Sequence, residues 1–209
     1  MNLLPHQLRP CLRRRVCLVG IGNPRLGDAA VGVRIAEALN SCHKPPLLPA
    51  DDTHDAEDPT PVLPSADSSA APASSPPPAS PVAARDPSTA ILLAATDPQK
   101  FLPEIVRGAY DHVVFIEAVD FGGRPGAVTV LRSEEILTRY TLNPPDARCL
   151  GALAEQIEAN GHTKTWVLGV QPASLRPDRP LSQSVQGTVQ ALVRLLSRET
   201  GLVCPSVPS

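Results

Sequence analysis

Residues 16–32 read VCLVGIGNPRLGDAAVG and combine three local structural signals. The apolar run 16–21 shows no polar alternation, which is typical of a strand buried on both faces. Three glycines, Gly20, Gly22 and Gly27, then predict a tight loop together with Asn23 and Pro24. From residue 31 the apolar positions recur at helical spacing. This part of the chain therefore predicts a strand, a glycine loop and a helix.

Asp28 stands at the end of this loop, where a carboxylate can cap the free N–H groups of the following helix. The residues alone also allow a dinucleotide-binding fingerprint, G-x-G-x-x-G. Arg25 occupies the third glycine position, however, and no acid follows about 20 residues later, as such a site requires. An ordinary strand-to-helix turn with a capping aspartate is the simpler interpretation. A third interpretation depends on the rest of the chain.

Composition narrows the classes of function. The chain has 209 residues, a net charge of -2 and 3% aromatic residues, which disfavours nucleic acid as a partner. We find no apolar segment typical of a signal peptide and no run of about 18 apolar residues, so no membrane partner is expected. The five cysteines are scattered and contain no C-x-x-C pair. They indicate neither a zinc ribbon nor a disulfide framework, and we expect a cytoplasmic location.

The domain organisation is expected to be a single α/β domain, 1–209, with a flexible N-terminal tail at 1–15 and an insert at 44–88. The insert holds about half of the 25 prolines, many alanines and serines, and an acidic cluster at 51–58. Because it has few bulky apolar residues, burial cannot offset the entropy of ordering it, and we expect disorder. A plain spacer and a docking segment for a partner are both compatible with this composition.

Apolar strand-like runs alternate with helical patterns in the remaining sequence. Strands are expected at 90–95, 112–118, 127–131 and 165–170, helices at 98–108, 149–160 and 181–199, and an irregular loop at 140–148. This alternation predicts an α/β fold, a three-layer sandwich whose mostly parallel, twisted sheet carries helices on both faces. Ligands of such sheets bind at the carboxyl ends of strands, which makes Asp28 and Glu117 candidate site residues.

Four segments, in this order, resemble signatures of the [NiFe]-hydrogenase maturation endopeptidases: GNPRLGDAAVG at 22–32, HVVFIEAVDFGGRPG at 112–126, VLGVQP at 167–172, and PLS at 180–182 followed by a helix. The resemblance spans about residues 16–196. It implies a phosphorylase/hydrolase-like sandwich and an endopeptidase, aspartic-type by family classification. The implied reaction removes a C-terminal peptide from the hydrogenase large subunit precursor once nickel is in place. No catalytic residue can be named from the sequence.

The metal site of that family is only partly matched here. In the family, one metal-ligating acid directly follows the motif aspartate. Here that position is Ala29, which cannot ligate a metal. The acid at the end of the third strand is Glu117. The family's histidine aligns with Asp146, or alternatively with Arg148 or Asn143. The family's glycine turn D-G-G-[ST] is LAAT at 93–96.

The resemblance implies that Glu117, assisted by Asp28 and Asp146, contacts the nickel of the substrate hydrogenase, and that no cofactor is tightly bound. It also implies that Gly22 and Asn23 belong to the substrate-binding loop. An all-oxygen ligand set favours harder cations than nickel. A non-catalytic relative that binds a hydrogenase subunit as an assembly factor therefore stays an alternative.

Overall fold

The structure is a computed structural model that describes residues 4–42, 89–135 and 145–202, with the side chains of 145–149 excepted. The expected insert, 44–88, lies outside these residues. All the elements described below belong to one compact unit, made of residues 1–44 and 86–209.

A five-stranded sheet forms the centre of this unit. Its strands are β1 (Val16–Ile21), β2 (Thr89–Ala95), β3 (His112–Ala118), β4 (Val128–Arg132) and β5 (Lys164–Val170). Their order is β2-β1-β3-β5-β4, and every neighbouring pair is parallel except β4 with β5. The predicted strands are confirmed to within one residue at each end, and so is the mostly parallel sheet. The first and third strands, β1 and β3, are neighbours in this sheet.

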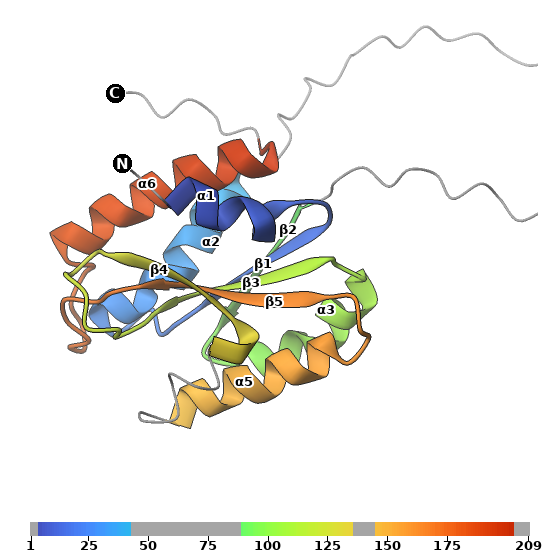
Figure 1. Cartoon of the computed structure of the whole chain (residues 1–209). Coiled ribbons are helices and arrows are strands. Elements are labelled where there is room, and N and C mark those ends of the chain that lie inside the picture. Colours follow the sequence, from blue (N-terminus) through green and yellow to red (C-terminus); the bar gives the residue numbers. More distant parts are fainter. Residues whose placement is uncertain (1–3, 43–88, 136–144, 203–209) are drawn as a thin grey trace, which may run out of the picture. The chain divides into compact units, whose positions relative to one another are not determined.

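Helices cover both faces of the sheet (Figure 1). One face packs against α1 (Leu4–Leu8), α2 (Val31–Cys42) and α6 (Gln183–Thr200), the other against α3 (Leu102–Gly108) and α5 (Pro145–Glu158). Side chains alternate between the faces along each strand. On β3, for example, Val114 and Ile116 join the core under α2 and α6, whereas Val113 and Phe115 join the core under α3 and α5. The predicted three-layer α/β sandwich is confirmed.

Helix α2 lies directly against the sheet because two glycines allow the approach. A Cβ atom on Gly32 would overlap the carbonyl oxygens of Ile21 and Ile116, and one on Gly20 would collide with the side chain of Ala36. Real Cβ atoms do not approach other atoms so closely, so both positions require glycine. A short 3-10 turn, η2 (Gly27–Ala30), leads from the β1 loop into this helix.

The expectation of a flexible tail over residues 1–15 is wrong for residues 4–12. These residues form α1 and a 3-10 turn, η1 (Arg9–Leu12). Leu8 and Cys11 are fully buried in the core beneath α6, and burial raises the pKa of the Cys11 thiol to about 12. The segment is held chiefly by apolar contacts, because full burial of a leucine side chain contributes about 1.5–3 kcal/mol.

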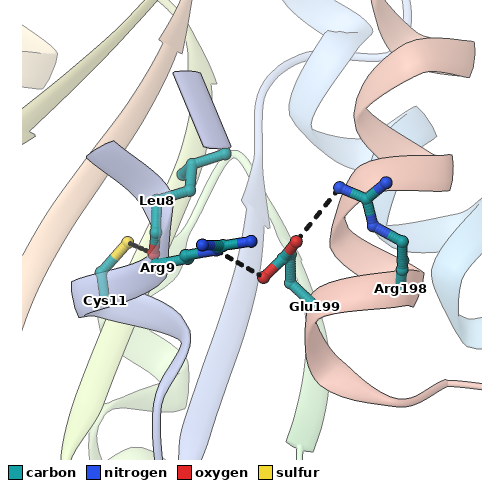
Figure 2. Close-up of polar contacts among 5 residues, drawn as sticks. All are labelled: Leu8, Arg9, Cys11, Arg198 and Glu199. Carbon is teal, nitrogen blue, oxygen red and sulfur yellow. Dashed lines mark hydrogen bonds and ion pairs between the residues drawn. The ribbon is translucent and has the colours of Figure 1, made fainter. Parts of the chain in front are cut away.

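Figure 2 shows how the same segment meets the end of α6 through polar contacts. The Arg9 Nε atom lies 3.5 Å from the Glu199 carboxylate, which Arg198 also contacts at 3.1 Å. The Cys11 thiol donates a hydrogen bond to the Leu8 carbonyl oxygen at 2.9 Å. Ion pairs with exposed arginines such as these contribute at most about 1 kcal/mol, so they orient the segment more than they stabilise it.

The cysteines differ from the expectation at one position. Cys11 and Cys17 are buried free thiols, but Cys42, at the end of α2, is disulfide-bonded. The spacing of the cysteines gave no signal for a disulfide. As for membrane association, no helix within the described ranges combines the length and apolar character needed to cross a bilayer.

Candidate active site

The carboxyl ends of the parallel strands β1, β2, β3 and β5 lie at one edge of the sheet. Ligands of open α/β sheets bind at this edge. The segments that follow these strands are 22–30, 96–97, 119–127 and 171–182. They contain most of the residues through which the sequence resembles the endopeptidase family.

Asp28 is fixed in this edge by partners far along the chain. It lies in η2 and is only 1% exposed. Its Oδ2 atom accepts hydrogen bonds from the backbone N–H of Ala173 at 2.8 Å, the backbone N–H of Ser174 at 3.1 Å and the hydroxyl of Ser182 at 2.9 Å. Its Oδ1 atom accepts one from the backbone N–H of Ser182 at 2.6 Å. The carboxylate therefore connects the β1 loop to the segment that leads into α6.

Two opposing effects act on the pKa of Asp28. Burial alone would raise it, but the hydrogen bonds from Ser182, Ala173 and Ser174 together lower it below its usual value. Hydrogen bonds donated to a carboxylate favour its charged form. Asp28 is thus held as an anion by backbone and hydroxyl donors.

The predicted helix cap at Asp28 is wrong, because its carboxylate makes no capping bond to η2 or α2. The sequence suggested a local partner, whereas the actual partners lie about 150 residues further along the chain. A metal role for Asp28 would have to compete with four hydrogen bonds already made, and that role stays a prediction.

Glu117 is half-buried at the end of β3. It alternates with Val113 and Phe115, so it belongs to the sheet face that packs against α3 and α5. Asp28, in contrast, bonds to the start of α6, which packs on the other face. Both acids lie at the carboxyl edge of the sheet, as predicted, but they belong to opposite sides of it.

Asp146 lies in the first turn of α5, because this helix begins at Pro145 and not at residue 149 as expected. The predicted irregular loop at 140–148 is therefore wrong from Pro145 onward. The side chain of Asp146 is outside the described part of the structure. Within the described residues, no three acidic, histidine or cysteine side chains form a group that could hold a metal ion. The predicted site of Glu117, Asp28 and Asp146 stays untested as a whole.

Gly22 and Ala29 are in contact where β1 ends. Gly22 has φ 139°, and a Cβ atom there would overlap the carbonyl oxygen of Ala29. The Gly22 N–H also donates to the Ala95 carbonyl oxygen at 2.8 Å, and Asn23 accepts a bond from the Arg25 N–H at 3.0 Å. Gly22 and Asn23 thus have structural reasons to be present, and their role in substrate binding stays a prediction. Ala29 offers no ligating side-chain atom.

Gln171 is a site residue whose role the sequence did not reveal. Its side chain is buried just after β5, and its Oε1 atom accepts hydrogen bonds at 3.0 Å from the N–H groups of Phe121 and Gly123. Its amide nitrogen donates to the Asp120 carboxylate at 3.0 Å. This bond, with a second from the Gly122 N–H, lowers the pKa of Asp120. The sequence signal that could have indicated this role is the position of Gln171, a polar residue directly after the buried strand β5.

An open pocket of about 490 Å³ lies beside the Asp28 carboxylate. It is formed by a single segment, and its lining residues are Ala173, Ser174, Arg176, Arg179, Pro180, Leu181 and Ser182. Three of these residues donate the bonds that hold Asp28. The shape of the pocket therefore depends on that carboxylate.

A comparison with protein-family models finds one described as "Hydrogenase maturation protease", which matches residues 82–199. This range runs from just before β2 to the end of α6 and covers more than half of the chain. A comparison with curated protein sequences finds no match.

Solved structures with a similar fold include several hydrogenase maturation proteases. HycI from Thermococcus kodakarensis matches with a TM-score of 0.65 and 20% identity, over 93% of this chain and 98% of its own. HybD from Escherichia coli matches with a TM-score of 0.59 and 24% identity, over 90% and 94%. HycI from Escherichia coli matches with a TM-score of 0.59 and 16% identity, over 93% and 99%. At these identities the matches establish the α/β fold.

Proposed function

The chain belongs to the hydrogenase maturation protease family, and from this premise we propose that it cleaves a C-terminal peptide from the nickel-loaded large subunit of a [NiFe]-hydrogenase. The observation that carries the proposal is the family match from residue 82 to residue 199, the part of the chain that supplies Glu117 and Gln171. The first motif, GNPRLGDAAVG, lies outside that match and supports it independently.

Glu117 is the residue of this chain that we assign to the nickel of the substrate. It closes a central strand, it is half-buried, and it lies at the sheet edge where ligands of such folds bind. Asp146 would assist from the first turn of α5. Asp28 would act chiefly by holding the 171–182 segment through its four hydrogen bonds. The partner is the large subunit precursor, and the compartment we propose is the cytoplasm.

Ala29 supports a second candidate function, a non-catalytic assembly factor that binds the same subunit. A methyl group replaces one expected ligand, and the carboxylate of the neighbouring Asp28 is already bound by four donors. Such a protein would keep the fold and the segments at the carboxyl edge of the sheet without cleaving the precursor.

The test is incubation of the full chain with nickel-loaded precursor, followed by intact mass measurement. We expect a mass loss equal to the C-terminal peptide, and we expect Glu117→Ala to abolish it. Glu37→Ala, which changes a half-buried acid of α2 that pairs with Arg34, should not. No cleavage by the native chain, together with cleavage by Ala29→Glu, would support the assembly factor. Binding of precursor without cleavage by either form would exclude the protease.

A further inference from the structure

The pocket beside Asp28 presents two guanidinium groups to solvent. Arg176 and Arg179 line it together with the hydroxyl-bearing Ser174 and Ser182 and the apolar Leu181. Both arginines are exposed. The planar guanidinium group of arginine binds a carboxylate or a phosphate with two parallel hydrogen bonds.

A third arginine lies on the adjoining loop. The Arg25 carbonyl oxygen accepts a hydrogen bond from the Asp178 N–H at 2.8 Å, so the two loops are in backbone contact. Within the described residues, none of the three guanidinium groups makes an ion pair or a hydrogen bond. The acids of these loops do not neutralise them, because Asp28 is buried and bound, and Asp178 is one exposed charge against three.

The segment that carries this charge is held in place. Asp28 accepts four hydrogen bonds from this segment. The donors are the backbone N–H groups of Ala173, Ser174 and Ser182 and the hydroxyl of Ser182. A binding loop that is already ordered loses less entropy when it binds. Leu175, on the same segment, is 52% exposed, and Phe121, on the neighbouring loop that Gln171 holds, is 36% exposed.

We propose that the 173–182 segment is a docking surface for an acidic segment of the protein substrate. Arg176 and Arg179 would bind carboxylates of that segment, Arg25 would strengthen the local positive potential, and Leu175 would cover an adjacent apolar side chain. The proposal rests on the proposed function for the identity of the partner. The charge favours carboxylates over nucleic acid phosphates because the whole chain has a net charge of -2 and only 3% aromatic residues.

The first experiment measures binding without requiring cleavage. The probe is a short fluorescein-labelled peptide of alternating leucine and glutamate, and its control is the same peptide with glutamine in place of glutamate. We expect the full chain to bind the acidic peptide, the glutamine peptide to bind far more weakly, and added salt to weaken binding.

The variant for this assay is the double change Arg176→Glu with Arg179→Glu, which should weaken binding by about tenfold or more. The matched control is Arg107→Glu, which alters an exposed arginine on α3 and should leave binding unchanged. If the double variant melts lower than the native chain, the milder Arg176→Gln replaces it. Equal binding of the two peptides, or no effect of the arginine changes, would overturn the proposal, as would tighter binding of a single-stranded DNA oligonucleotide at the same arginines.

The second experiment separates docking from the proposed protease activity. In precursor cleavage, the double variant should raise KM with kcat nearly unchanged, since it removes binding that is made equally in the ground and transition states. An unchanged KM in an active enzyme would refute the docking surface and leave the protease intact. Peptide binding by a chain that never cleaves would refute the protease and leave the docking surface intact.

Discussion

Replacing Asp28 with asparagine should destabilise the fold, and the structure gives a magnitude. Asparagine keeps one carbonyl oxygen, which can retain the three bonds now made to Oδ2. Its amide nitrogen would then face the Ser182 N–H, which lies 2.6 Å from Oδ1 in the native chain. One charge-assisted bond is lost and a half-buried N–H loses its acceptor, which together cost about 2–4 kcal/mol.

The assay is urea unfolding at neutral pH, followed by circular dichroism, with a thermal scan beside it. For a domain of this size, 1 kcal/mol corresponds to roughly 2–4 °C in Tm, so we expect a decrease of roughly 4–16 °C. The matched control is Asp178→Asn, the same chemical change in an exposed residue of the same segment. It should change the free energy of unfolding by no more than about 0.5 kcal/mol.

The effect should also depend on pH in one direction. Burial would raise the pKa of Asp28, but the bonds from Ser182, Ala173 and Ser174 lower it in the folded state. The ionised carboxylate therefore stabilises the fold fully above its unfolded pKa of about 3.9, and this contribution is lost as the pH falls through the folded pKa. The difference between the native chain and Asp28→Asn should be constant near neutrality and shrink only in acid. A variant as stable as the native chain, or a difference that does not shrink in acid, would refute the assigned role.

Three further changes test other parts of the structure. Ala95→Gly should stabilise the protein by about 0.5–1 kcal/mol in urea unfolding. Ala95 has φ 49°, and the backbone strain that glycine removes exceeds the conformational entropy that it adds to the unfolded chain. As a control, Ala90→Gly, inside β2, should destabilise the protein. Leu8→Ala should cost about 2–5 kcal/mol in the same assay, since Leu8 is fully buried, and a change below about 0.5 kcal/mol would restore the flexible-tail interpretation. Gln171→Leu should speed hydrogen exchange at the Phe121 and Gly123 amides while the β3 amides stay protected.

The sheet could be predicted because its signal is local. Each strand is a short apolar run bounded by turn residues. The run VVFI at 113–116, for example, predicts a strand that is buried on both faces of the sheet, as β3 is. The N-terminal segment gave no such signal. Residues 4–12 contain Pro5 and Pro10, and a helix of five residues has little stability of its own, so it exists because Leu8 and Cys11 reach the core. The start of α5 was missed because the paired prolines that precede Asp146 suggested a turn.

The candidate site was predictable in position but not in detail. The expected ends of the first and third strands placed Asp28 and Glu117 at the correct edge of the sheet. Which donors Asp28 meets depends on a segment about 150 residues away, and no local pattern encodes that contact. The side of the sheet to which Glu117 belongs depends on the pairing register, since a shift by one residue would turn it to the other face. The sequence shows Gln171 only as part of the VLGVQP motif, because its hydrogen bonds join two loops that are distant in sequence.

The close contact of α2 with the sheet couples two features that look separate in the sequence. Any side chain at Gly32 would displace the first turn of α2 from Ile116 and Ile21, and Asp28 lies four residues upstream on the rigid 3-10 turn joined to that helix. Lifting the helix would draw the carboxylate away from Ser182 and loosen the segment that carries Arg176 and Arg179. A methyl group added at Gly32, beneath the helix, would thus loosen a surface loop. The position of the Asp28 carboxylate depends on the absence of a side chain at Gly32.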